Sequence, residues 1–151
     1  MRFESRAFET GRSIPEQYAC DGQNVSPELH WQDVPEGTES LAIICDDPDA
    51  PRKVWVHWVL YDLPAKTTHL AEQVPPAERL PTGGTQGRND FGTIGYGGPC
   101  PPSGTHRYVF QLYALDRKLG LQPGATKQQV LKAMQGHVIA EAQLTGTYTR
   151  H

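Results

Sequence analysis

The sequence of 151 residues predicts a mostly β protein with short helices near the C-terminus. Three apolar runs rich in β-branched and aromatic residues have the composition of strands that are covered on both faces. The 15 glycines and 13 prolines favour turns and ordered loops, and both residue types interrupt helices, which argues against a helical bundle. A chain of this length has room for one hydrophobic core, so we expect a single domain over residues 1–151.

The three expected strands lie between turn signals. They are Leu41–Cys45, which is stopped by an Asp-Asp-Pro turn, then Val54–Tyr61 and His106–Leu115. Side chains alternate along a strand, so each strand presents a defined set of residues on one face. In the second strand, one face is expected to carry Trp55, His57, Val59 and Tyr61. In the third strand, one face is expected to carry His106, Tyr108, Phe110 and Leu112.

The segments around the third strand differ in character. Residues 63–102 are rich in turns and show no periodicity, and loops of that length in a compact domain are usually functional. Thr126 and Gln129 form a capping box, which predicts a helix that ends near Gly136. A second short helix is expected over His137–Leu144, and Thr147–Thr149 is expected to finish the chain as a strand.

Charge and hydropathy exclude several functional classes. The 14 basic and 17 acidic side chains give a formal net charge of -3, with no basic stripe for nucleic acid and no polybasic membrane anchor. The N-terminus lacks the apolar run of a signal peptide, and no stretch approaches the roughly 20 apolar residues that span a bilayer. We therefore expect a cytoplasmic protein that neither inserts into membranes nor binds nucleic acid.

The cysteine pattern predicts free thiols. Cys20, Cys45 and Cys100 are an odd number and have no CxxC spacing, so neither a disulfide framework nor a zinc site is indicated. Reduced thiols are the ordinary state in the cytosol.

Polar residues at the ends of the apolar strands indicate a pocket. Asp47 follows the first strand, His57 interrupts the second and His106 opens the third, each near a loop rich in glycine and proline. Taken singly, each has a commoner structural explanation: a histidine satisfied in the core, or an aspartate that bonds its own turn. Their coincidence on three strands favours convergence on one pocket.

Several ordered blocks carry a family resemblance. They are Asp47-Pro48-Asp49-Ala50-Pro51, Trp55-Val56-His57-Trp58 and Gly98–Phe110. These blocks resemble the signature motifs of the phosphatidylethanolamine-binding protein family, also called the Raf kinase inhibitor protein family. Further segments are similar to its bacterial branch, namely Cys20–Trp31, Asn89–Gly92, Gly95–Gly98 and Gly146–Arg150. The resemblance extends over nearly the whole chain.

The resemblance implies a β-sandwich of two packed sheets with short peripheral helices, no cofactor, and a small preformed anion pocket. Such pockets take the phosphate of a phospholipid head group or nucleotide, or a small carboxylate. The ligand-binding residues implied by the motifs are Asp47, Trp55, His57, Gly98, Cys100, Pro101, Pro102, His106 and Tyr108. The second acid of its block, Asp49, is expected to organise the loop.

Physical chemistry agrees with these assignments. His106 and Tyr108 lie about 7 Å apart along one strand face, close enough to hold one oxyanion. The carboxylate of Asp47 is expected to raise the pKa of His57 or His106, so that phosphate affinity weakens as the pH rises through the imidazole range. Prolines hold the rim in shape before the ligand arrives, and one Xaa-Pro bond is expected to be cis. The leading hypothesis is a binding protein without turnover.

Alternative hypotheses remain open. Cys100, in a loop before a histidine, has the setting of an activated thiol in a hydrolase. Zinc, manganese or iron is an alternative ligand, and the candidate metal ligands are Asp47, Asp49, His57 and His106. Relatives inhibit kinases or serine proteases, so residues 63–96 form a candidate contact surface for such a partner. The bacterial branch also suggests a homodimer.

Overall fold

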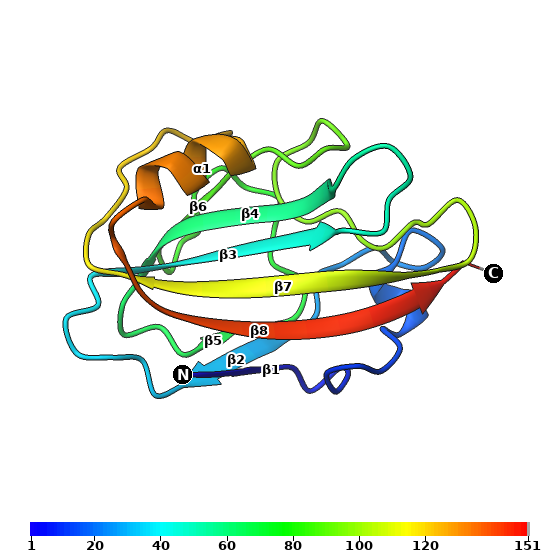
Figure 1. Ribbon diagram of the computed structural model, residues 1–151, viewed down its shortest axis with the longest axis horizontal. Coiled ribbons are helices and arrows are strands. Elements are labelled where there is room, and N and C mark those ends of the chain that lie inside the picture. The colour runs from blue at the N-terminus through cyan, green and yellow to red at the C-terminus, as the bar shows by residue number, and fades with distance from the viewer. Residues whose placement is uncertain (151) are drawn as a thin grey trace.

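The computed structural model describes residues 1–150, which form two packed β-sheets with a helix on the outer face of the larger sheet (Figure 1). The larger sheet is antiparallel in the order β6 (Thr85–Gln86), β4 (Trp55–Pro64), β3 (Ser40–Asp47), β7 (Thr105–Leu115) and β8 (Val138–Thr149). The smaller sheet has the order β1 (Arg2–Glu4), β2 (Leu29–Gln32) and β5 (His69–Leu70). The helices are the 3-10 turn η1 (Glu16–Tyr18) and α1 (Lys127–Met134). The predicted mostly β sandwich is confirmed.

The central strand β3 is buried on both faces, as its unbroken apolar run predicted. Leu41, Ile43 and Cys45 point into the core between the two sheets, which also contains Trp31 of the smaller sheet. Ala42 and Ile44 pack in a second core beneath α1, which contributes Val130 and Met134. Apolar layers on both sides therefore fix β3 in the middle of the molecule.

A β-bulge corrects the expected face of β4. Cys45 pairs with Trp58 whereas Asp46 pairs with Val56, so His57 is an extra residue that has no partner position on β3. Such a bulge bends the strand and redirects a side chain. Beyond it, Val59 and Tyr61 lie in the core under α1. The pocket face contains Trp55 and His57 but not Val59 or Tyr61, contrary to strict alternation.

Strand β7 follows the predicted alternation. Tyr108, Phe110 and Leu112 lie in the core between the sheets, and His106 is also buried. The predicted capping box of α1 is confirmed as well, since Gln129 N–H donates to Thr126 Oγ1 at 3.2 Å and Thr126 N–H donates to Gln129 Oε1 at 2.9 Å.

The predicted second helix at His137–Leu144 is wrong. From Val138 onward that segment is the first part of β8, which pairs with β7 from Thr105 opposite Thr149 to Leu115 opposite Val138. Its period is two: Ala140, Ala142, Leu144 and Tyr148 pack on the core between the sheets. Long-range pairing with β7 overrides the local helical preference of this short apolar segment. The expected last strand, Thr147–Thr149, is the end of β8.

Buried amides order the long segment between β4 and β7. Gln86 accepts a hydrogen bond from Trp58 Nε1 at 2.8 Å and donates to the carbonyls of Pro75 and Ala77. Asn89 donates to the carbonyl of Gly95 at 2.9 Å and accepts from the amide of Phe91 at 3.0 Å. Tight turns around these amides bring Phe91 to the end of the larger sheet.

No helix within residues 1–150 is long and apolar enough to cross a membrane.

Candidate functional site

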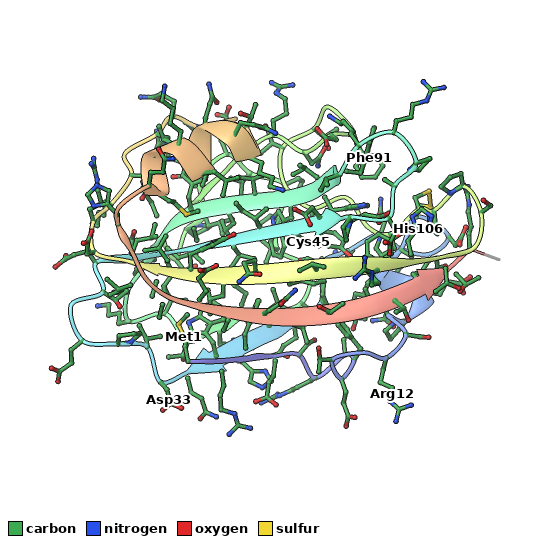
Figure 2. All side chains as sticks on the ribbon, in the orientation of Figure 1. Met1, Arg12, Asp33, Cys45, Phe91 and His106 are labelled. Atoms are coloured by element: carbon green, nitrogen blue, oxygen red, sulfur yellow. A yellow bond between two sulfur atoms is a disulfide. The ribbon has the colours of Figure 1, made fainter. Side chains whose placement is uncertain are left out.

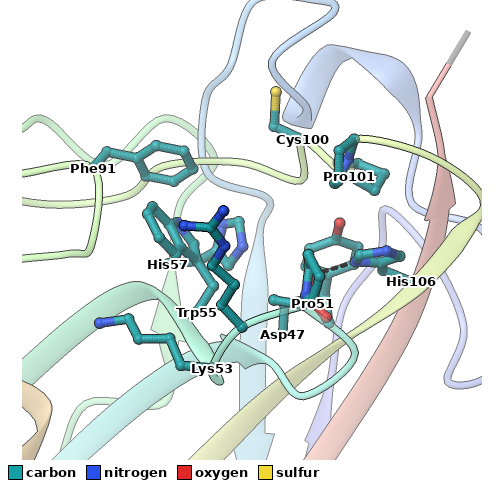
Figure 3. Close-up of a pocket in the computed structure, with 13 residues that line it drawn as sticks. Asp47, Pro51, Lys53, Trp55, His57, Phe91, Cys100, Pro101 and His106 are labelled. Carbon is teal, nitrogen blue, oxygen red and sulfur yellow. Dashed lines mark hydrogen bonds and ion pairs between the residues drawn. The ribbon is translucent and has the colours of Figure 1, made fainter.

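A pocket of about 420 Å³ lies where β3 ends and where β4 and β7 begin (Figure 3). Because β4 and β7 are both antiparallel to β3, the end of β3 and the starts of β4 and β7 lie together at one end of the sheet. The lining residues are Asp47, Ala50, Pro51, Arg52, Lys53, Trp55, His57, Phe91, Cys100, Pro101, Pro102, His106 and Tyr108. The volume is that of a site for a small organic molecule.

A carboxylate–imidazole pair forms part of the pocket floor. Nδ1 of His106 lies 2.7 Å from Oδ2 of Asp47, and both side chains are nearly buried, with 10% and 5% of their surface exposed. The other carboxylate oxygen of Asp47 accepts the amide N–H of Asp49 at 2.8 Å. These contacts fix the imidazole of His106 in one orientation.

The second histidine has a different partner. Nδ1–H of His57 donates to the carbonyl of Gly97 at 2.6 Å. A carbonyl only accepts, so Nδ1 carries the proton and Nε2 of the neutral ring carries a lone pair. Burial lowers the pKa of His57 below the ordinary value of 6.5, although the Gly97 carbonyl and the Asp47 charge act in the opposite direction. On balance the pKa of His57 is lowered, so the raised pKa expected for one of the two histidines does not apply to His57.

Tyr108 supplies a neutral phenol. The residue is 1% exposed, and its ring lies edge-on to His57 with centroids 5.1 Å apart. Burial, and next the negative charge of Asp47, raise the pKa of Tyr108. The hydroxyl therefore stays protonated near neutral pH and can donate a hydrogen bond.

The rim contains a disulfide that the cysteine pattern did not predict. Cys100 is bonded to Cys20, with an S–S distance of 2.08 Å, and only Cys45 is free and buried among the described cysteines. The expectation of three reduced thiols is therefore wrong, because folding joins residues that are 80 positions apart. The hydrolase alternative requires a free thiol at Cys100, and this sulfur is part of the disulfide. No cis peptide occurs in residues 1–150, so the expected cis proline is also wrong.

Gly98 shapes the rim without lining the pocket. Its amide donates to Oδ1 of Asn24 at 2.8 Å. A Cβ at this position would lie 2.1 Å from the carbonyl oxygen of Tyr18, so only glycine permits this approach. Pro101 and Pro102, in contrast, face the pocket together with Cys100.

Asp49 lies outside the pocket lining and makes its contacts with Arg107. Its carboxylate accepts two hydrogen bonds from the guanidinium of Arg107, at 2.8 and 2.9 Å, and one from the Arg107 amide at 2.9 Å. The Arg107 contacts lower the pKa of Asp49 to about 2. These hydrogen bonds between Asp49 and Arg107 hold the loop after β3 to the start of β7.

Within residues 1–150, no three His, Cys, Asp or Glu side chains form a group suited to a metal ion.

Sequence reasoning missed five lining residues. Ala50, Pro51, Arg52 and Lys53 come from the loop between β3 and β4, and Phe91 comes from the long segment before β7. Ala50, Pro51 and Phe91 lie inside quoted motif blocks, and two adjacent cations follow the first block directly. Those features were visible signals, but no periodicity shows which way a loop side chain points.

Comparisons with known proteins agree with this fold and identify a family. The family model for phosphatidylethanolamine-binding proteins matches residues 4–149. A UPF0098 protein of Methanothermobacter thermautotrophicus is 58% identical over 150 residues, 99% of either chain, and one from Aquifex aeolicus is 48% identical over 99% of this chain and 89% of its own. Among solved structures, the homologue CT736 of Chlamydia trachomatis has a TM-score of 0.92 and 44% identity, over 99% of this chain and 97% of its own. Escherichia coli YbcL has a TM-score of 0.92 and 37% identity, over 99% and 98%.

Proposed function

Because the chain belongs to the phosphatidylethanolamine-binding protein family, we propose that its pocket binds a small molecule through an anionic group, such as a phosphate monoester or a carboxylate, without converting it. The carrying observation is the convergence of Asp47, His106 and Tyr108 on one preformed pocket. A phospholipid head group and a nucleotide phosphate share the chemistry that this floor recognises.

The floor offers two kinds of donor to an oxyanion. Asp47 holds Nδ1 of His106, and in the imidazolium form the other ring nitrogen is also a donor. Tyr108 adds a phenol that stays protonated. Hydrogen bonds to a charged acceptor are roughly twice as strong as neutral ones, and a buried site weakens them less than water does.

The neutral His57 adds selectivity to this proposal. The lone pair of its Nε2 accepts a hydrogen bond, and the P–O–H group of a phosphate monoanion can donate one. We therefore expect a monoprotonated phosphate ester to satisfy the donors and the acceptor of the floor together.

Calorimetry with phenyl phosphate tests the proposal. Replacing His106 by Gln is expected to weaken binding at pH 6.5 by about tenfold or more, because a charge-assisted hydrogen bond is lost. The matched control is His137→Gln, since Nδ1 of His137 also contacts an aspartate, Asp116 at 2.8 Å, but on the exposed surface far from the pocket. That control is expected to bind like wild type. An absence of binding to wild type, or equal affinity in folded His106→Gln, would refute the proposal.

A further inference from the structure

The two cations at the pocket mouth have different surroundings. Nζ of Lys53 lies 3.4 Å from the carboxylate of Asp90 and 5.7 Å from the ring centroid of Trp55. Arg52 also lines the pocket, yet within residues 1–150 no carboxylate lies within ion-pair distance of its guanidinium. The positive charge of Lys53 is balanced by the protein, whereas that of Arg52 is not.

The charge of the floor differs from that of the mouth. Asp47 brings one negative charge, His106 at most one positive charge, and the buried His57 and Tyr108 are neutral near pH 7. The sum at the floor is therefore zero or negative. The positive charge that remains in the pocket belongs to Arg52, so the unbalanced charge that can attract a second anionic group lies at the mouth.

Apolar side chains separate the floor from the mouth. The ring centroids of Trp55 and Phe91 are 5.6 Å apart, and Phe91 also contacts His57 edge-on at 5.3 Å. Pro51 and Pro101 add apolar lining on the side of Asp47 and His106 (Figure 3). Inorganic phosphate at the floor would leave this apolar wall and most of the 420 Å³ without a ligand contact. A flat aromatic body is suited to such a wall, because aromatic rings pack well edge to face.

On the basis of the proposed function, we propose that Arg52 is a second anion-binding subsite, so that the pocket selects molecules with two anionic groups on an aromatic body. The first anionic group lies at the floor with His106 and Tyr108. The second meets the planar guanidinium of Arg52, which binds a carboxylate or phosphate through two parallel hydrogen bonds. The aromatic body lies between the two subsites against Trp55 and Phe91, whose rings meet edge to face.

Two related probes separate the subsites. Phenyl phosphate carries an anionic group at one end of the ring, and 4-carboxyphenyl phosphate carries one at either end. Calorimetry in low salt is expected to show that wild type binds 4-carboxyphenyl phosphate about tenfold more tightly, as for one added charge-assisted contact. The preference is expected to shrink in high salt because the mouth is open to solvent.

Variants assign the preference to Arg52. In Arg52→Gln, affinity for 4-carboxyphenyl phosphate is expected to fall about tenfold and affinity for phenyl phosphate only about twofold, so that the preference shrinks from about tenfold to about twofold. The matched control is Arg12→Gln, which removes the same charge at the opposite side of the molecule from Phe91 (Figure 2). That control is expected to retain the wild-type preference.

The outcomes distinguish this inference from the proposed function. If wild type binds both probes equally well, or Arg52→Gln keeps the tenfold preference, the second subsite is refuted while anion binding at the floor stands. If wild type binds neither probe, the proposed function itself fails. If Arg12→Gln loses the preference as Arg52→Gln does, general charge attraction explains the preference and the subsite is again refuted.

Discussion

Two histidines reach the same pocket with different hydrogen-bond partners. His106 faces the carboxylate of Asp47, whereas His57 donates to the carbonyl of Gly97. A carboxylate stabilises positive charge on an imidazole, but a carbonyl in a dry environment compensates the burial of that charge only in part. The floor therefore combines a group suited to holding an anion with a neutral group that accepts a hydrogen bond.

The buried state of His57 predicts a pH dependence of stability. Its pKa is lowered in the folded protein, so below pH 6.5 the unfolded chain takes up a proton that the folded chain refuses. The free energy of unfolding is therefore expected to fall as the pH falls below 6.5, with a contribution from His57 of up to about 1.4 kcal/mol per pH unit. Urea unfolding between pH 5 and 8 measures this slope.

The variant His57→Gln keeps a donor for Gly97 and does not titrate. Its unfolding free energy is expected to depend less steeply on pH than that of wild type below pH 6.5, whatever its stability at pH 8. Equal slopes in the two proteins would show that His57 does not titrate differently on folding.

Residue types at strand ends predicted much of the site. The strand assignment and the antiparallel pairing of neighbouring strands are enough to bring together Asp47, His57 and His106. Arg52 and Phe91 were missed because loop conformation sets where they point, and no local period encodes it. The roles of the lining residues in binding remain predictions.

Sheet pairing, not local preference, decides the structure of the C-terminal segment. Val138–Leu144 is short and rich in alanine, so its local pattern favours a helix, but β7 offers a complete set of hydrogen-bond partners along its length. Gly146, two residues after the segment expected to be helical, lies inside β8. Its role is steric, because it lets the N-terminal segment approach the strand.

Substitution of Gly146 tests this close approach. A Cβ there would lie 2.5 Å from Cγ1 of Ile14 and 2.8 Å from Cε2 of Phe8, so both core side chains must move. Gly146→Ala is therefore expected to lower the free energy of unfolding by about 1–3 kcal/mol, as overpacking does. Gln143→Ala, at an exposed position of the same strand, is the control and is expected to change it by less than about 0.5 kcal/mol.

The opposite result is informative for Gly146. In an uncrowded strand, alanine is more stable than glycine by roughly 0.5–1 kcal/mol, since glycine loses more backbone entropy on folding. A Gly146→Ala protein as stable as wild type in chemical unfolding would therefore mean that Ile14 and Phe8 do not press on β8.

At the scale of the whole molecule, the N-terminal segment and the pocket rim are joined as one unit. Besides the disulfide, the amide of Cys20 donates to the carbonyl of Pro99 at 3.0 Å, and the hydroxyl of Tyr96 donates to the carbonyl of Tyr18 at 2.7 Å. The strand pattern predicted a mostly β protein and the family resemblance implied the sandwich, but neither predicted this connection, because it depends on where two irregular segments meet in three dimensions.

The disulfide is expected to stabilise the fold through the unfolded chain. Closing a loop of about 80 residues removes chain entropy worth roughly 4 kcal/mol. In urea unfolding, the free energy of unfolding of Cys20→Ser/Cys100→Ser is therefore expected to be lower than that of wild type by about this amount. Wild type in a dithiol reductant is expected to lose a similar amount, whereas the double variant is expected not to respond to the reductant. The hydrogen bonds of Pro99 and Tyr96 remain in both cases, so the difference isolates the covalent bond. Equal unfolding free energies of oxidised wild type and the double variant would show that these hydrogen bonds alone hold the rim to the N-terminal segment.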